Sequence, residues 1–303
     1  MTPAKRSAHT DLVQPRSLII GFLAPAVLLY LLFFVYPVAQ AMVYSLYRGS
    51  PLTGNFHWVG LRNFYRLLFE DDIFWRCVRH NLAFVFVGGA LTLLLGLTIA
   101  LALAKIDAGR SAFRLIYLFP HVMSGVAVTI LWSFIFNPSF GLFNGMLRNV
   151  GLHTWTRAWL GEPYTTMPTL IVIHVWMSVG FYVVLFYAGL MRIPAEYQEA
   201  ARIDGASAFA EFRHVTLPLL MEVTRISTIY AAISGLSVFG LVFLINEGNV
   251  NKYDEVLMTY LYDQGFKQGN FGYGSAIAVV SLVLVLVLAW LINRLFAGHE
   301  VQM

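Results

Sequence analysis

Long uncharged runs separated by charged connections dominate the chain. Six runs contain no Asp, Glu, Lys or Arg, and they cover residues 17–47, 81–104, 115–136, 167–191, 226–245 and 275–292. An α-helix rises about 1.5 Å per residue, so about 20 residues cross a hydrocarbon core of roughly 30 Å. A charge in the middle of such a helix would cost roughly 2.5–3.5 kcal/mol. The pattern therefore predicts an all-α integral membrane protein with six transmembrane helices.

The composition supports a membrane protein. Apolar residues make up 58% of the chain and charged residues 12%, and the mean hydropathy is +0.69, which is outside the usual range of soluble domains. The first run is much longer than a signal-peptide core, so it is expected to be a retained helix, kinked or tilted at Pro25 and Pro37. Cys77 is the only cysteine, so it has no partner for an internal disulfide and is expected to be a packing residue. The net charge of +4 comes without the basic and aromatic interleaving of nucleic-acid binders.

The basic residues outside the runs indicate an orientation. If both termini are cytoplasmic, eleven basic residues lie inside and nine outside. The inner set is Lys5, Arg6, Arg16, Lys105, Arg110, Arg114, Arg192, Arg202, Arg213, Arg225 and Arg294, and the outer set is Arg48, Arg62, Arg66, Arg76, Arg79, Arg148, Arg157, Lys252 and Lys267. Residues 63–79 mix arginines with large apolar side chains, which suits either an amphipathic helix at the outer membrane surface or a solvated linker helix.

The connection over residues 192–225 is the longest charged stretch on the predicted cytoplasmic side. Pro194 can occupy a first helical turn, Gly205 can take the left-handed conformation that ends the helix, and Ser207 can cap the next one. Glu199 can pair with Arg202 three residues later. A helix, a glycine elbow and a second helix are therefore expected.

This connection resembles the EAA signature of binding-protein-dependent ABC importers. The matching residues are Glu199, Ala200, Ala201, Asp204, Gly205, Leu217 and Pro218. The resemblance implies a single permease domain over residues 1–303, in which a cytoplasmic coupling loop, residues 192–225, docks on a separate ATPase subunit. Its expected coupling residues are Glu196, Glu199, Ala200, Ala201, Asp204, Gly205, Phe209 and Phe212.

The rest of the chain resembles the sugar-permease branch of that family, the MalF/UgpA-like subunits. The segments that carry the likeness include residues 24–37, 59–68, 141–152 and 271–280. The resemblance implies solute-contacting positions at His174, Met177, Ser178, Phe181, Tyr230 and Ser234. The helical spacing agrees independently, because His174, Ser178 and Phe181 fall on one face. The alternative is that these side chains only join helices or pack within the protein.

The resemblance further implies the partners of the chain. They are a second permease subunit, an ATP-binding cassette ATPase dimer, an extracytoplasmic solute-binding protein, a sugar substrate and membrane lipid, in a bacterial or archaeal cytoplasmic membrane. No GxxxxGK[ST] phosphate loop is present, so the chain is expected to be non-catalytic and to bind no cofactor, with ATP and Mg²⁺ held by the partner ATPase.

Two alternatives remain open for the transported solute and the energy source. Within the same family, the solute could be glycerol phosphate or a polyol, although the runs hold no Arg or Lys for a phosphate. An ion-coupled secondary carrier would need ionisable groups inside its spans. Only the histidines His121 and His174, and no Asp or Glu, lie there.

Overall fold

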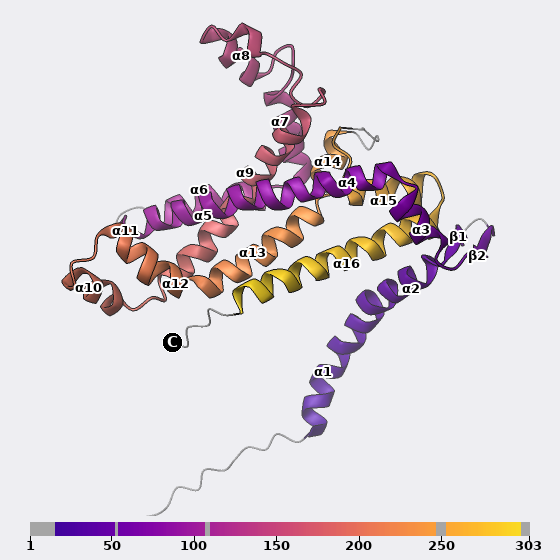
Figure 1. The fold of residues 1–303 in the computed structure, drawn as a ribbon, viewed down its shortest axis with the longest axis horizontal. Helices are drawn as coiled ribbons and strands as arrows, with labels where there is room; N and C mark the ends of the chain where they lie inside the picture. Colours follow the sequence, from indigo (N-terminus) through magenta and orange to yellow (C-terminus); the bar gives the residue numbers. More distant parts are fainter. Residues whose placement is uncertain (1–15, 52–53, 107–109, 247–252, 298–303) are drawn as a thin grey trace, which may run out of the picture.

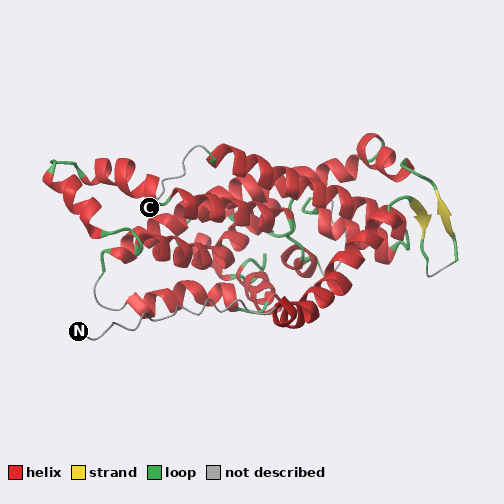
Figure 2. Cartoon of the chain, turned by 90° about the horizontal axis from the view of Figure 1, so that it is seen from below, coloured by secondary structure: helices red, strands yellow, loops and turns green. Residues whose placement is uncertain are grey.

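The computed structural model describes residues 16–51, 54–106, 110–246 and 253–297. Helices dominate it, with one two-stranded antiparallel ribbon (Figures 1 and 2). The α-helices and strands are α1 (Arg16–Tyr30), α2 (Tyr36–Tyr44), β1 (Tyr47–Gly49), β2 (Phe56–Trp58), α3 (Arg62–Phe69), α4 (Asp72–Ala83), α5 (Gly89–Ala104), α6 (Arg110–Val122), α7 (Gly125–Ile135), α8 (Leu142–Asn149), α9 (Thr166–Leu190), α10 (Ala195–Ile203), α11 (Ala208–Glu211), α12 (Leu217–Leu219), α13 (Met221–Leu236), α14 (Gly240–Ile245), α15 (Leu257–Tyr262) and α16 (Phe271–Phe296). Single π-helical turns, Leu31–Val35, Phe84–Gly88, Phe212–Thr216 and Asp263–Lys267, join several of these helices end to end, and His153–Trp155 form a 3₁₀ turn.

The membrane spans confirm the predicted architecture with one correction. Five helical stretches are long and apolar enough to cross a membrane: Ile20–Tyr44, Asp72–Ala104, Thr166–Leu190, Met221–Ile245 and Phe271–Phe296. The third predicted run, residues 115–136, is not one straight helix, because α6 and α7 meet at an angle of 102°. Pro120 removes a backbone donor near the end of α6, and Ser124 is extended at φ −58° and ψ 133°. The third span along the chain is therefore broken.

The prediction of one amphipathic helix over residues 63–79 was wrong. The segment forms two helices, because α3 ends at Phe69 and Asp71 caps a new helix, α4. The Asp71 carboxylate accepts hydrogen bonds from the backbone N–H groups of Ile73 and Phe74. The second span consequently begins at Asp72 instead of residue 81. Leu67, Phe74 and Cys77 are buried against α15 and α16, so the apolar face lies inside the protein. The packing role predicted for Cys77 is confirmed.

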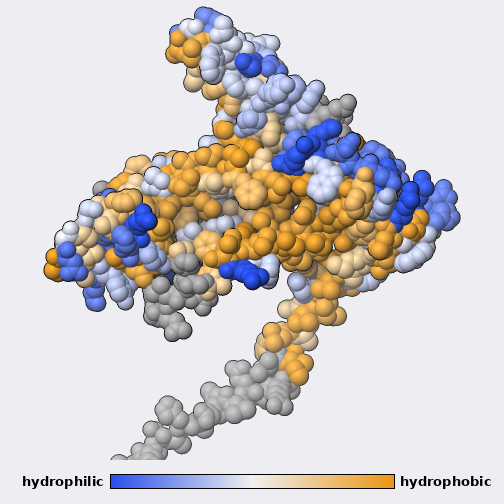
Figure 3. Space-filling view, viewed as in Figure 1, coloured by the Kyte–Doolittle hydropathy of each residue, from blue (hydrophilic) through white to orange (hydrophobic). Residues whose placement is uncertain are grey.

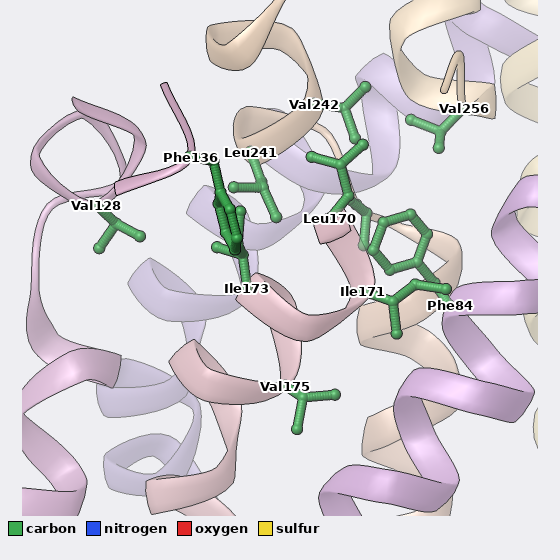
Figure 4. Packing of buried hydrophobic residues seen from close by; sticks show 11 residues of the cluster. Phe84, Val128, Phe136, Leu170, Ile171, Ile173, Val175, Leu241, Val242 and Val256 are labelled. Carbon is green, nitrogen blue, oxygen red and sulfur yellow. The ribbon is translucent and has the colours of Figure 1, made fainter. Parts of the chain in front are cut away.

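The helix α9 lies at the centre of the core. Leu170, Ile171 and Ile173 from its N-terminal half pack with Phe84 and with side chains of α7 and α14 (Figure 4). Backbones come very close at Gly180, where an added Cβ would lie 1.8 Å from the carbonyl oxygen of Tyr117 on α6. A glycine is therefore required at this crossing.

The two ends of the bundle differ in the elements they carry. The short helices α10, α11 and α12 lie at one end, and α3 and the ribbon of β1 and β2 lie at the other, with α5, α9, α13 and α16 running between them (Figure 1). Hydrophilic residues gather at both ends, and an apolar belt lies between them (Figure 3). The helix α1 stands away from the bundle, whereas α2 contacts α16, and α7 and α8 project from another side (Figure 1). Among the basic residues used to predict the orientation, Lys5, Arg6 and Lys252 lie outside the described residues, as do the side chains of Arg16, Arg110 and Arg114.

Candidate functional site

The span Met221–Ile245 is also interrupted, because residues 237–239 separate α13 from α14. A pocket of about 270 Å³ forms where this break and the start of α7 meet α9. Three of the six predicted pathway residues line it, namely His174 and Met177 from α9 and Ser234 from α13. The rest of its lining is Gly125, at the start of α7, and Ser237, Val238, Phe239, Gly240 and Leu241, which form the α13–α14 turn and the first residues of α14. The breaks in the two spans therefore open onto the same small space.

Two other predicted pathway residues, Phe181 and Tyr230, form a separate aromatic layer. Their ring centroids lie 4.8 Å apart. His121, near the end of α6, stacks on Phe181 at 5.3 Å, and Tyr182 lies 6.2 Å from Tyr230. Because α9 and α13 run in opposite directions, this layer lies further toward the end that carries α10 than the pocket does. Ser178 is half-buried on α9 between the two groups and is not among the residues that line the pocket.

The interrupted helices also supply main-chain polarity. The first residues of α7 and the last residues of α13 have N–H and C=O groups without helical partners. Irregular backbone at membrane depth is tolerated where protein buries it or where it lines a water-filled cavity. Apart from His174, the described lining holds no residue with an ionisable acid or base. The pocket therefore suits an uncharged solute with hydroxyl groups.

The predicted helix–glycine–helix geometry of residues 192–225 is present. Glu196, Glu199, Ala200 and Ala201 lie on α10, and Asp204 follows its last residue. Gly205 has φ +80°, and the backbone N–H of Ala206 donates to the carbonyl of Ala201 at 2.9 Å, as expected for a glycine-terminated helix. Ser207 accepts a hydrogen bond from the backbone N–H of Ala210 and caps α11.

The predicted pairing of Arg202 with Glu199 was wrong. The Arg202 guanidinium instead bonds to the carboxylate of Glu211 at 3.0 Å, across the elbow from α10 to α11. This hydrogen bond and charge raise the pKa of Arg202, with a smaller contribution from the charge of Glu199. The elbow is thus held by contacts between its two arms, which spacing along one helix could not reveal.

The connection presents apolar side chains to its surroundings. Ile203 is 85% exposed and Phe209 is 69% exposed. Phe212 is half-buried and lines a groove of about 700 Å³ between this connection and the ends of α5 and α9. These two side chains and the groove are therefore accessible at the surface of the connection.

Comparison with known proteins decides the family. A family model described as "Binding-protein-dependent transport system inner membrane component" matches residues 92–298. The chain belongs to this family. The predicted resemblance is therefore confirmed, and the chain is a multi-pass membrane permease component.

Two relatives of this permease extend over nearly the whole chain. The diacetylchitobiose uptake system permease protein NgcF of Streptomyces coelicolor is 33% identical over 312 residues, covering 98% of this chain and 87% of that protein. The trehalose/maltose transport system permease protein MalF of Thermococcus litoralis is 33% identical over 279 residues, covering 91% and 93%. A chain from the crystal structure of a bacterial ABC transporter involved in alginate import superimposes with a TM-score of 0.82 at 23% identity, covering 95% of this permease and 97% of that chain. That likeness shows a shared fold.

Sequence reasoning missed part of the pocket in this permease. Gly125, Ser237, Phe239 and Gly240 were not singled out, although Ser-Gly at residues 124–125 and the Ser-Val-Phe-Gly run at residues 237–240 interrupt otherwise apolar helices. Such Gly-interrupted apolar segments are the sequence signal of discontinuous transmembrane helices at binding sites. Within the described residues, no group of three or more His, Cys, Asp or Glu side chains could hold a metal ion.

The end of the permease that carries α15 holds two buried carboxyl groups outside the spans. Asp254 is 0% exposed and Glu255 is 3% exposed. Burial, helped by the charges of Asp263 and Asp254, raises the pKa of Glu255 to about 8. Burial raises the pKa of Asp254 to about 6, opposed by the hydrogen bond from the Asn246 amide. At neutral pH Glu255 is therefore mostly protonated and Asp254 mostly ionised.

Proposed function

We propose that this permease is the membrane-spanning subunit of an ATP-driven importer for a sugar or oligosaccharide, and that it forms the translocation pathway by alternating access. The observation that carries the proposal is the uncharged pocket at the two helix breaks, lined by His174, Met177 and Ser234. Imidazole and hydroxyl groups can hydrogen-bond sugar hydroxyls. The aromatic layer of Phe181 and Tyr230 offers rings for the C–H faces of a sugar, and Ser178 lies between the two groups. The names of these two relatives refer to trehalose, maltose and diacetylchitobiose, which supports a saccharide.

The coupling role belongs to residues 192–225 within a single permease domain, residues 1–303. In this proposal the exposed arms around Gly205 dock on an ATPase subunit, which holds ATP and Mg²⁺ and performs the hydrolysis. Glu196, Glu199, Ala200, Ala201 and Asp204 form the first arm, and Phe209 and Phe212 belong to the second. A second permease subunit and an extracytoplasmic solute-binding protein complete the importer, in a bacterial or archaeal inner membrane with both termini of this chain in the cytoplasm.

A phosphate-bearing solute and an ion-coupled mechanism both fit the described residues less well. A phosphate-bearing solute such as glycerol phosphate would require Arg or Lys near it, and the described pocket lining holds neither. An uncharged polyol would fit the same pocket as a sugar, so uptake assays must separate these two. An ion-coupled carrier would place acidic groups among the pathway residues, and the described lining holds no Asp or Glu.

The test is uptake by the complete importer in proteoliposomes. This chain is purified with its partner permease, ATPase and binding protein, and labelled disaccharides, oligosaccharides, polyols and glycerol 3-phosphate are compared. We expect ATP-dependent uptake of a saccharide. His174→Ala, Ser234→Ala and Tyr230→Ala should each reduce uptake about fivefold, since a lost hydrogen bond to a buried neutral group is worth about 1 kcal/mol.

The matched control is Ser281→Ala on α16. Ser281 is buried, and its hydroxyl donates to the carbonyl of Ile277 at 2.8 Å. This variant should transport at the wild-type rate. Wild-type uptake by all three pathway variants would contradict the pathway, and preferential uptake of a polyol or glycerol 3-phosphate would contradict the saccharide.

A further inference from the structure

Asn81 joins the second span to two helices that are remote from it in sequence. Its side chain is 0% exposed. The amide Nδ2 donates to the carbonyl oxygens of Gly235 at 2.9 Å and Leu236 at 3.0 Å, and Oδ1 accepts from the backbone N–H of Leu257 at 2.9 Å. One side chain thus uses both amide hydrogens and one acceptor site to bind three backbone groups on two other helices.

These backbone partners are the ones that helix ends leave unsatisfied. Gly235 and Leu236 are the last residues of α13, and Leu257 is the first residue of α15. Terminal C=O groups of a helix and its first N–H groups have no intrahelical partner, and burying them without one is unfavourable. Asn81 therefore allows α13 to end inside the protein.

The interruption of α13 is the same one that shapes the pocket. Immediately after Leu236, Ser237 and Val238 turn into the pocket lining opposite His174. The absence of a side chain at Gly235 brings this end close to the second span, since an added Cβ would lie 2.9 Å from the backbone nitrogen of Val85. The position of the turn is thus set by packing at Gly235 and by the hydrogen bonds of Asn81.

We propose that Asn81 is a positioning residue for solute recognition, which holds the turn after α13 against the pocket that contains His174. The inference rests on the proposed function only in taking this pocket as part of the solute pathway. Asn81 does not line the pocket and acts through the turn. Each donated hydrogen bond that is lost should raise the population in which the turn has moved away from the pocket by about fivefold.

The chain offers a matched control in Asn144. This residue is 1% exposed, and its amide binds the backbone of Pro138 and Arg157 and accepts from the indole Nε1 of Trp159. It has the same side chain and similar burial, yet it ties the loop after α8 instead of the turn after α13. A general effect of losing a buried asparagine should appear equally at both sites.

The test measures local opening directly by thiol labelling. Val238, in the turn, is 6% exposed, and Ala158 lies half-buried in the Asn144 loop. Val238→Cys and Ala158→Cys are each placed in the complete importer, combined with Asn81→Asp, Asn81→Ala or Asn144→Asp. Maleimide labelling is followed on the relevant peptide by mass spectrometry, so buried Cys77 and the partner subunits do not interfere. Saccharide uptake is measured on parallel preparations that carry the same Asn81 or Asn144 change without the added cysteines.

We expect Asn81→Asp to raise the labelling rate at Val238→Cys about fivefold or more and to leave Ala158→Cys unchanged, with the reverse for Asn144→Asp. The Asn81 variants should also raise the solute concentration for half-maximal uptake more than they lower the maximal rate. Unchanged labelling of Val238→Cys would overturn the proposal, as would loss of the assembled complex in both Asn81 variants, which would assign Asn81 to folding. Absence of saccharide uptake by the wild-type importer would instead contradict the proposed function, and the labelling would still decide where Asn81 acts.

Discussion

The ring of Phe181 on α9 faces the ring of Tyr230 on α13, with centroids 4.8 Å apart. His121, on α6, also stacks on Phe181, with ring centroids 5.3 Å apart. The three rings therefore join α6, α9 and α13 at one level of the bundle, which lies nearer to α10 than the pocket lined by His174 does. Any solute that leaves the pocket toward α10 would meet these rings.

The first prediction concerns this aromatic pair. Tyr230→Phe keeps the ring and should retain more uptake than Tyr230→Ala, which loses both the ring and the hydroxyl. Phe181→Ala should lower uptake several-fold, because an aromatic pair contributes about 0.5–1.5 kcal/mol beyond its buried area. Initial uptake rates of the complete importer measure the difference. Tyr30 and Phe34 form a stacked pair on the exposed first span at 5.2 Å and serve as the control through Tyr30→Ala. Equal losses in Phe181→Ala and Tyr30→Ala would contradict a specific role for the pathway pair.

The second prediction concerns the elbow glycine. Gly205→Val forces a β-branched residue into φ +80°, which costs about 1–2 kcal/mol. We expect ATP hydrolysis stimulated by the binding protein, and uptake, to fall at least fivefold while the spans remain inserted. Gly151→Val is the control, because Gly151 has φ +83° and, like Gly205, open space where a Cβ would lie. If Gly151→Val impairs stimulated hydrolysis as much, backbone strain alone explains the loss and coupling does not.

The third prediction concerns the ion pair across the elbow. Arg202→Glu and Glu211→Arg should each reduce stimulated ATP hydrolysis, because like charges then face each other between α10 and α11. The double variant restores opposite charges and should recover a substantial part of the activity. The pair is partly exposed, so the effect should weaken as salt is added. Arg213→Glu, an exposed charge change in the same connection, controls for net charge. No recovery in the double variant would show that the pairing is not what positions the two arms.

The fourth prediction concerns pH and Glu255. The pKa of Glu255 rises from its ordinary value of 4.5 to about 8 on folding, so the folded protein binds the proton more tightly than the unfolded chain. The contribution of the protonated form to stability is complete below about pH 4.5 and is lost as the pH rises toward about 8. We expect the melting temperature of the purified complex to decline over this range.

Glu255→Gln should flatten that decline, since the amide does not titrate. Asp263→Asn should shift the decline to lower pH, because the charge of Asp263 helps to raise the pKa of Glu255. Glu70→Gln, at an exposed site, should leave the profile unchanged. A wild-type profile in Glu255→Gln would mean that another group sets the pH dependence.

The sequence by itself determined the membrane architecture and the elbow. Uncharged runs must lie in lipid, since isolated charges there are costly, and the run over residues 167–191 became α9 almost residue for residue. The elbow followed from local chemistry, because the left-handed turn at Gly205 and the cap at Ser207 depend on neighbours within a few residues.

Only the tertiary structure decided where spans break and which side chains meet. A buried helix end needs partners from other segments, as α13 finds in Asn81 across more than 150 residues of sequence, and no local pattern predicts such a partner. The same reason explains the wrong pairing of Arg202, whose carboxylate partner, Glu211, lies on the opposite arm. Periodicity placed His174, Ser178 and Phe181 on one face of α9, but His174 lines the pocket, Phe181 belongs to the aromatic layer and Ser178 lies between them. Hydropathy reports burial in lipid, whereas the identity of a neighbour depends on how the helices pack.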